Sequence, residues 1–312
     1  MKRIQYHQYG GPEVMRLEEA EIPTPGKREL LVRVLAAAVN PVDFGIRSGK
    51  LRFLTGRRFP RGMGQDFAGV VEDVGHGVTK FKPGDAVFGG LLPRPAAAFG
   101  QWVVAHERYV ASKPPALSWE RAAAIPVAGV TGYGAVLKAG RLRPGQNVFI
   151  TGCLGAVGRS AAEVALMHGA TVSGSCRITA KDTAESIGIE PVVDFEFDPV
   201  PFARRFDLII HTAGELSIRR ARSMLKPDGR IVDVVASPAK LVRSAFTPQY
   251  HVMYGEITPK DLQTLAQGAT DGMLAFPIAR TVTLDDAITA LTELQTDHTP
   301  KGGKLVITPS AQ

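Results

Sequence analysis

The stretch of sequence that decides the fold is NVFITGCLGAVG, residues 147–158. Residues 147–151 are mostly apolar, which predicts a short buried strand. Residues 156–168 then carry apolar side chains close to helical spacing, with Gly169 placed to end the helix. Strand, glycine-rich loop and helix in this order predict a dinucleotide site, where the loop approaches a pyrophosphate and the helix N-terminus offers free N–H groups. The alternative is a glycine turn needed only to pack the helix on the sheet.

The residues expected to hold the coenzyme in this loop are Gly152, Leu154, Gly155, Ala156, Val157 and Gly158. Further apolar strands are expected at residues 171–175, 206–210 and 229–235, separated by helical patterns. This alternation predicts parallel strands joined by right-handed crossovers. We therefore expect an α/β fold with a Rossmann-type, doubly wound parallel sheet.

The end of the second strand indicates which dinucleotide is bound. Sites specific for NAD usually place an acid there, where it bonds the ribose 2′-hydroxyl. No acid occurs in residues 171–181, and Ser175, Arg177 and Lys181 stand there instead. These side chains suit a 2′-phosphate, because a guanidinium pairs with phosphate oxygens. The sequence predicts NADPH as the cofactor, with a purely surface role for Arg177 as the alternative.

The first part of the chain, up to about residue 115, has a different texture. Short apolar runs at 30–34, 69–74, 86–88 and 101–104 alternate with Gly and Pro turns, which predicts a β-rich, barrel-like unit. Helix starts are expected at Ser118, Thr258 and Thr283. The last strand, 304–307, is expected to return to this β-rich unit. The predicted domains are 1–117 with 273–312, and 118–272.

Composition narrows the class of protein. The 312 residues carry a net charge of +7, with 45% hydrophobic and 21% charged residues, which is typical of a globular protein. Basic residues form only short clusters, so no nucleic-acid partner is predicted. There is no apolar run of membrane-spanning length and no signal peptide, so a cytoplasmic protein is expected. Two cysteines cannot form a disulfide framework.

Motifs along nearly the whole chain resemble the medium-chain dehydrogenase/reductase superfamily, in its zinc-free NADPH:quinone oxidoreductase branch. They lie at residues 40–43, 46–49, 64–71, 81–87, 123–131, 155–158, 226–230 and 302–306. The resemblance implies a GroES-like catalytic domain built from both chain ends around the Rossmann domain, often in a homodimer. It also implies that Thr131 contacts the coenzyme, and we assign Lys304 of the last motif to the same role. Ala236 is assigned to it because it follows a strand at the carboxyl edge of the sheet.

Metal ligands are missing where zinc-dependent relatives carry them. The early cysteine position falls within residues 40–43, and the Gly-His-Glu position reads Gly64-Gln65-Asp66. Neither stretch offers the thiolate or imidazole that Zn²⁺ prefers, so no metal is predicted.

Asn40 and Asp43 are the candidate catalytic residues, Asn40 by resemblance to the family. Its amide is suited to donate to a developing oxyanion, and its alternative role is to fix the turn before Pro41. Asp43 is expected to anchor the loop or a ribose, or to act only as a cap. Gly45 stands where relatives carry Tyr or Lys, which removes the usual proton donor and leaves water as a source.

Three functions follow from these residues. The first is hydride transfer from NADPH to a small-molecule quinone. The negative charge that hydride addition creates is delocalised over the quinone, so no metal ion is needed. The second is reduction of the double bond of an enone or alkenal. The third is NADPH binding without turnover, as a sensor or accessory protein, which Gly45 favours.

Overall fold

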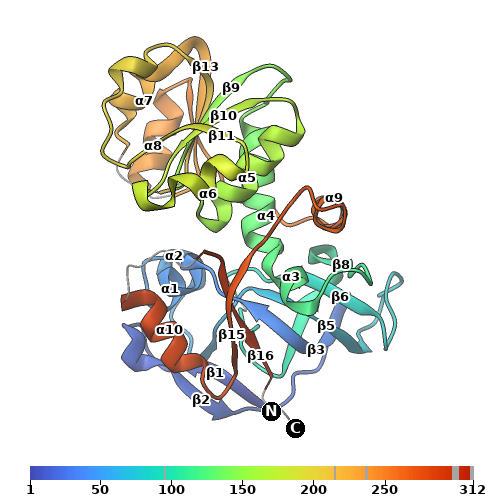
Figure 1. Ribbon diagram of the computed structural model, residues 1–312. Coiled ribbons are helices and arrows are strands. Elements are labelled where there is room, and N and C mark those ends of the chain that lie inside the picture. The colour runs from blue at the N-terminus through green and yellow to red at the C-terminus, as the bar shows by residue number, and fades with distance from the viewer. Residues whose placement is uncertain (95, 214–215, 236–237, 297–301, 310–312) are drawn as a thin grey trace. The chain divides into compact units, whose positions relative to one another are not determined.

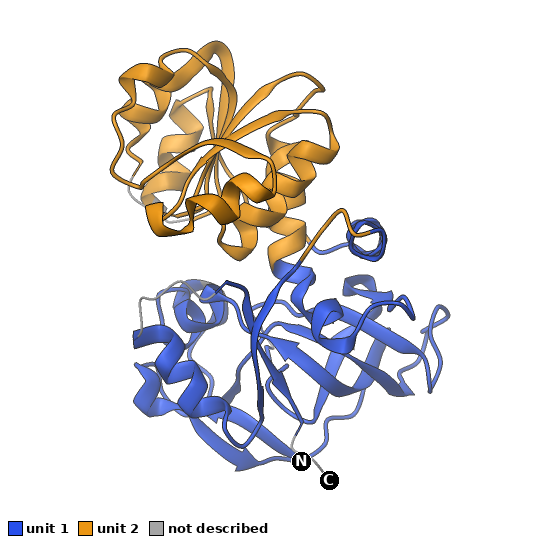
Figure 2. Ribbon diagram, in the orientation of Figure 1, with its two compact units in different colours: residues 1–127, 257–271, 276–312 blue, residues 128–256, 272–275 orange. Residues whose placement is uncertain are grey.

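The glycine-rich loop lies in the second of two units into which the chain divides (Figures 1 and 2). The computed structural model describes residues 1–94, 96–213, 216–235, 238–296 and 302–309. Unit 1 comprises Met1–Val127, Ile257–Asp271 and Phe276–Gln312, and unit 2 comprises Ala128–Glu256 and Gly272–Ala275. Both termini therefore belong to unit 1, and most of unit 2 is inserted between its segments.

Unit 2 contains a sheet of six strands in the order β11-β10-β9-β12-β13-β14, and every neighbouring pair is parallel. The chain thus starts in the middle, runs out to one edge, and crosses back to build the other half. This is the strand order of a Rossmann dinucleotide-binding fold. The strands are β9 (Asn147–Thr151), β10 (Thr171–Ser175), β11 (Ile189–Val193), β12 (Phe206–His211), β13 (Leu225–Asp233) and β14 (Tyr250–Val252).

Helices connect these strands and pack against them. Helix α5 packs on β9 and β10, α6 on β11, α7 on β13, and α8 on β14 (Figure 1). The core is aromatic on one side, where the ring of Phe149 contacts those of Phe197, Phe202 and Phe206. The helical segments are α4 (Pro126–Tyr133), which begins in unit 1, the π-helical turn η3 (Gly134–Ala139), α5 (Ala156–Met167), α6 (Lys181–Ser186), α7 (Ile218–Met224) and α8 (Pro238–Phe246).

Unit 1 is built on two sheets. A three-stranded sheet has the order β2-β1-β4, and a seven-stranded sheet has the order β15-β16-β3-β5-β6-β8, with β7 also paired to β3. The strands are β1 (Lys2–Tyr6), β2 (Arg16–Glu19), β3 (Glu29–Ala38), β4 (Arg61–Gly62), β5 (Asp66–Val74), β6 (Ala86–Gly90), β7 (Trp102–His106), β8 (Val110–Ser112), β15 (Ile278–Thr283) and β16 (Lys304–Thr308). Strand β16 pairs antiparallel with β3, so the chain end does return to the β-rich unit.

The helices of unit 1 are α1 (Pro41–Arg47), α2 (Arg52–Thr55), α3 (Trp119–Ala124), α9 (Pro259–Thr270) and α10 (Ala287–Thr296). The unit boundaries differ from the expected ones, since α3 and α9 belong to unit 1. Helix α3 packs its alanine-rich face on β3 and β5, and α9 packs on β8. The local sequence pattern predicted both helices. Which unit each helix joins depends on the apolar surface that it covers, and tertiary packing decides that. None of the helices in the described ranges has the length and hydropathy of a membrane span.

Candidate active site

The loop between β9 and α5 has the geometry that a pyrophosphate requires. Gly152 has a φ of +64°, a conformation that side chains rarely adopt. A Cβ on Gly158 would lie 2.1 Å from the Gly152 carbonyl oxygen, so helix and loop approach each other too closely for any other residue. Gly155 precedes the helix, and both it and Ala156 are exposed. The first-turn N–H groups of α5 have no helical acceptor, which leaves donors for an anion.

The loop lies where the strand order of unit 2 reverses, between β9 and β12. Thr151 ends β9, and its hydroxyl accepts hydrogen bonds from the N–H groups of Thr212 and Ala213, at 3.0 and 3.3 Å. The Thr212 hydroxyl donates back to the Thr151 carbonyl at 2.5 Å. These bonds hold the ends of the two strands together beside the loop. Such a reversal point is where open α/β sheets bind their ligands.

The end of β10 carries the residues expected to select the coenzyme. Arg177 is exposed and Lys181 is half-exposed, with Lys181 Nζ 3.4 Å from Glu185. Ser175 is buried, because it is the last residue of an interior strand paired on both sides. The structure also brings an acidic residue, Asp194, to this strand end, although it lies outside residues 171–181. Asp194 follows the neighbouring strand β11 and lies near enough to Cys176 to contribute to the raised pKa of that thiol, whose main cause is burial.

A second polar group lies at the ends of β12 and β13. Asp233 Oδ2 accepts from Tyr250 at 2.8 Å, pairs with Lys240 Nζ at 2.8 Å, and lies 3.1 Å from His211 Nδ1. Burial acts to raise the pKa of Asp233, but the hydrogen bonds from His211 and Lys240 outweigh it and lower this pKa to about 2. The network fixes the strand end that leads to Ala236, which itself lies outside the described residues.

Thr131 and Lys304, the other two coenzyme candidates, differ in their surroundings. Thr131 lies half-buried on α4, close to Gly255, where a Cβ would be 2.5 Å from its hydroxyl oxygen. Lys304 is buried in unit 1, and its ammonium donates to Asn40 Oδ1, Asp66 Oδ2 and the Ala124 carbonyl at 2.9, 3.1 and 3.2 Å. All three ammonium hydrogens therefore have acceptors within unit 1.

Lys304 forms part of a buried polar cluster, defined here as Asn40, Asp43, Asp66 and Lys304. Three adjacent strands of the large sheet bring it together: β3 ends just before Asn40, β5 begins at Asp66, and β16 begins at Lys304. Asn40 Nδ2 donates to Asp66 Oδ2 at 2.9 Å, and Asp43 Oδ2 accepts from the Asn40 N–H at 2.8 Å. Asp66 and Lys304 are partners that the sequence did not reveal.

Burial changes the protonation of this cluster. It raises the pKa of Asp43 to about 8, and the neighbouring Asp66 carboxylate adds to the effect. It also raises the pKa of Asp66, although Lys304 and Asn40 oppose this. Asp43 Oδ1 has no hydrogen-bond partner among the described residues. The raised pKa favours the neutral form of Asp43, while the backbone hydrogen bonds from Asn40 and Gln65 and the charge of Lys304 oppose it.

The cluster does not fit a zinc ion. The position of the Gly-His-Glu motif is filled by Gln65 and Asp66, and the Gln65 amide donates to the Leu91 carbonyl at 2.8 Å. The oxygens of Asn40 and Asp66 already share the Lys304 ammonium. Among the residues described, no group of three or more His, Cys, Asp or Glu is placed to hold a metal. The donor set lacks the thiolate and imidazole ligands typical of zinc.

A GroES-like unit and a Rossmann unit in one chain define a dehydrogenase or reductase architecture. Residues 26–115 match the alcohol dehydrogenase GroES-like domain family, and residues 187–307 match the zinc-binding dehydrogenase family. The chain belongs to the medium-chain dehydrogenase/reductase superfamily and, within it, to the quinone oxidoreductase branch. It is therefore an oxidoreductase of a family that uses a nicotinamide cofactor and small-molecule substrates.

Three relatives illustrate this placement. The chloroplastic quinone-oxidoreductase QR1 of Triphysaria versicolor is 30% identical, over 79% of this chain and 78% of its own length. The 2-methylene-furan-3-one reductase of Solanum lycopersicum is 32% identical, over 74% of this chain and 61% of its own length. The solved structure of the quinone oxidoreductase from Coxiella burnetii superposes with a TM-score of 0.89 at 28% identity, covering 99% of both chains.

Proposed function

We propose that the protein transfers hydride from NADPH to a quinone without a metal ion. The observation that carries this proposal is the buried polar cluster of unit 1, which offers hydrogen-bond donors and a proton but no zinc ligand set. Hydride addition to a quinone spreads the new negative charge over a conjugated system, so hydrogen bonds can stabilise it. The similarity to proteins named quinone oxidoreductases supports the same substrate class.

Asn40 is the proposed donor to the oxygen on which charge develops. One of its amide N–H groups is held by Asp66, and the other has only a long contact, 3.5 Å, with the Ala38 carbonyl. Asp43 is the proposed source of the proton, because burial raises the pKa of its carboxyl to about 8. In relatives a Tyr or Lys stands at the position of Gly45. In this assignment Asp43 takes over the role of that Tyr or Lys.

The bound nicotinamide dinucleotide supplies the hydride. Gly152, Leu154, Gly155, Ala156, Val157 and Gly158 are proposed to hold its pyrophosphate, with Thr131 and Ala236 as further contacts. Ser175, Arg177 and Lys181 are proposed to favour the 2′-phosphate, and the Asp194 carboxylate opposes them. Lys304 is proposed to affect the coenzyme indirectly, through its hydrogen bond to Asn40. The family resemblance supports a homodimer, which sedimentation analysis would test.

An activity panel tests this function. We expect loss of reduced-nicotinamide absorbance with 1,4-benzoquinone and 9,10-phenanthrenequinone, and a lower rate with NADH. Arg177→Ala should raise the KM for NADPH about tenfold or more, as expected for loss of one charge-assisted pair, and leave that for NADH unchanged. Arg219→Ala, an exposed arginine on α7, is the matched control. Tight NADPH binding without turnover of any electrophile would refute the catalytic proposal.

Reduction of an enone double bond is the second candidate. It is favoured by the similarity to a 2-methylene-furan-3-one reductase. The required groups are the same, because charge also delocalises in an enone. Turnover of alkenals and cyclic enones without turnover of quinones would select this reaction over the first.

A further inference from the structure

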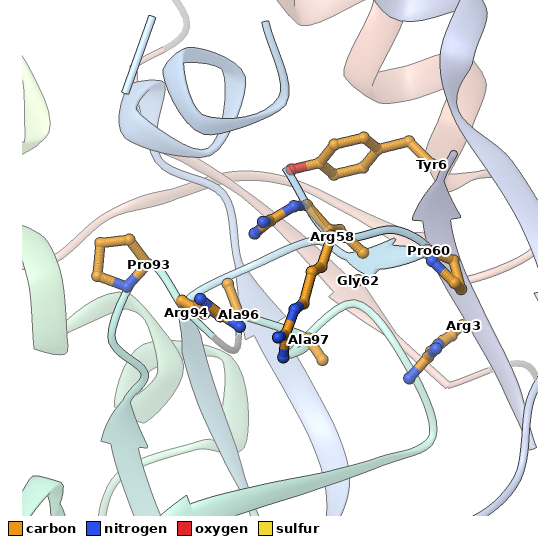
Figure 3. Close-up of a pocket in the computed structure, with 10 residues that line it drawn as sticks. Arg3, Tyr6, Arg58, Pro60, Gly62, Pro93, Arg94, Ala96 and Ala97 are labelled. Carbon is orange, nitrogen blue, oxygen red and sulfur yellow. The ribbon is translucent and has the colours of Figure 1, made fainter. Parts of the chain in front are cut away.

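A cavity of about 240 Å³ lies in unit 1. No residue of the buried polar cluster lines it, and four of its lining residues are arginines. They are Arg3 from β1, Arg58, Arg61 from β4, and Arg94. Figure 3 shows Arg94 on the wall opposite Arg3, and the ring of Tyr6 extending from its strand with the hydroxyl directed toward the side where Arg58 lies. One water takes about 30 Å³ of liquid, so the cavity has room for an anion of several atoms.

The charges around this cavity are not balanced. None of the lining residues that the structure describes is acidic. Arg3 donates to Gln5 at 2.7 Å and also interacts electrostatically with Glu18, which lies outside the lining, whereas Arg61 donates to the neutral Thr55 carbonyl. For Arg58 and Arg94 no hydrogen bond or ion pair is found within the described ranges. Arg58, Arg61 and Arg94, for which the described residues supply no acidic partner, repel each other and attract a counter-charge.

Two of the four guanidiniums, those of Arg61 and Arg94, also approach each other beside Gly56. Arg94 Nη1 lies 3.7 Å, and Arg61 Nη2 3.9 Å, from the point where a Cβ on Gly56 would be. Arg61 is held in place by the rings of Phe59 and Tyr9, at 5.4 and 5.9 Å from their centres. An arginine stacked on aromatic rings loses less conformational freedom when it binds an oxyanion.

Two buried polar atoms at the cavity have no partner. Tyr6 is 0% exposed, and its hydroxyl has no hydrogen-bond partner among the described residues; the same holds for Nε of Arg61. Burial raises the pKa of Tyr6 to about 12, so the hydroxyl remains a donor at neutral pH. Buried polar groups are normally paired, and an unpaired one at a cavity indicates a missing partner.

We propose that this cavity binds the phosphate group of a small molecule, held by Arg58, Arg61 and Arg94 with Tyr6 as a neutral donor. A phosphate carries about two negative charges and several acceptor oxygens, which matches several guanidinium forks better than one carboxylate does. The proposal does not depend on the proposed reaction. The phosphate can come from a free ion, a phosphorylated acceptor or a nucleotide.

The position of the cavity in the chain makes a phosphorylated acceptor worth testing. Its lining residues Gly62 and Pro93 are close in the chain to the start of β5 and the end of β6, where Asp66 pairs with Gly90. Gly62 lies four residues before Asp66, so their Cα atoms are at most about 15 Å apart. The cavity and the buried polar cluster therefore lie near each other in unit 1, and this nearness is the reason to include a phosphorylated aromatic probe.

Calorimetric titration of the full chain at low salt tests the site. The probes are inorganic phosphate, phenyl phosphate and NADPH, with phenol and sodium chloride as controls for the ring and for ionic strength. We expect saturable binding of one inorganic phosphate or phenyl phosphate per chain at the cavity. NADPH is also proposed to bind at the glycine loop, so for this probe the result is the change in affinity or stoichiometry in the variants below. Binding of inorganic phosphate alone would indicate a free ion as the ligand. Tighter binding of phenyl phosphate would indicate a phosphorylated acceptor. A loss of affinity in the variants that is confined to NADPH would indicate a nucleotide.

The variants are Arg58→Ala with Arg94→Ala, and separately Tyr6→Phe, which removes only the hydroxyl. The double variant should weaken binding at least tenfold and Tyr6→Phe severalfold. Arg57→Ala, an exposed neighbour outside the lining, should bind like the wild type. If the double variant does not fold, Arg94→Gln alone carries the test. The proposal would be overturned by unchanged binding of all three probes in the double variant, by an equal loss in Arg57→Ala, or by no saturable binding of either phosphate probe together with unchanged NADPH binding.

Discussion

Replacing Lys304 by methionine tests how the buried polar cluster of unit 1 is held together. The ammonium lies 3.1 Å from Asp66 Oδ2, and the two side chains are 5% and 0% exposed. The substitution keeps most of the apolar length but leaves the Asp66 carboxylate, within the described part of the chain, with Asn40 Nδ2 and the Val127 N–H as its donors. Removing one partner of a buried ion pair costs about 3–5 kcal/mol, because the other charge stays buried.

Urea unfolding followed by circular dichroism measures this loss. A deficit of about 3–5 kcal/mol corresponds to a fall in Tm of roughly 10 °C for a unit of this size. Burial already raises the pKa of Asp66, and loss of Lys304 raises it further. The folded variant then binds a proton that the unfolded chain releases, so the deficit should grow as pH rises and shrink toward a pH of about 4.

Two further variants serve as controls for this result. The double variant Lys304→Met/Asp66→Asn removes the stranded charge and should recover most of the loss. Lys2→Met removes an ion pair with Asp285 that is 47% and 46% exposed, and should cost less than about 1 kcal/mol. Equal small losses in Lys304→Met and Lys2→Met, or a double variant less stable than the single one, would refute the reasoning.

Three other variants test single positions. The raised pKa of Asp43 makes the wild type lose stability, on the order of 1 kcal/mol per pH unit, as pH rises from about 4 to 8. Asp43→Asn should remove this pH dependence, which denaturation at several pH values measures. Gly45→Ala should stabilise the protein by about 0.5–1 kcal/mol in thermal unfolding, because the nearest atom to the new Cβ is 3.9 Å away on Leu51 and the helix gains from alanine. Gly158→Ala places a Cβ 2.1 Å from the Gly152 carbonyl and should weaken coenzyme binding by calorimetry at least tenfold, whereas unchanged affinity would contradict the assigned loop.

The Rossmann unit was largely predictable because its signals are local. The expected strands 147–151 and 171–175 and the helix after Gly155 occur at those residues, and Gly169 ends the helix with a φ of +72°. Ser118 and Thr258 cap their helices through hydrogen bonds from Arg121 and Asp261 N–H groups. Glycine spacing, capping residues and apolar runs act within a few positions, so sequence is enough to recognise them.

Elements that depend on partners were missed or misplaced. Strand β11 contains Pro191 and lies at the edge of its sheet, and β14 has only three residues, so neither has a clear apolar pattern. Strand β13 begins at Leu225 rather than 229 and ends at Asp233 rather than 235. Helix α10 begins at Ala287, after β15 and a turn in which Thr283 bonds Asp286. In each case pairing with a distant strand decides the boundary.

The candidate site divides in the same way. The sequence alone determined the glycine loop, the lack of an acid in residues 171–181, and the lack of zinc-type ligands, because each follows from residue types at short spacing. Only the tertiary structure decided that Lys304 bonds Asn40, 264 positions earlier, and that Asp194 approaches the end of β10. The charge of a buried group depends on its neighbours and its burial, and both are set by strands that are adjacent in the sheet and distant in the chain.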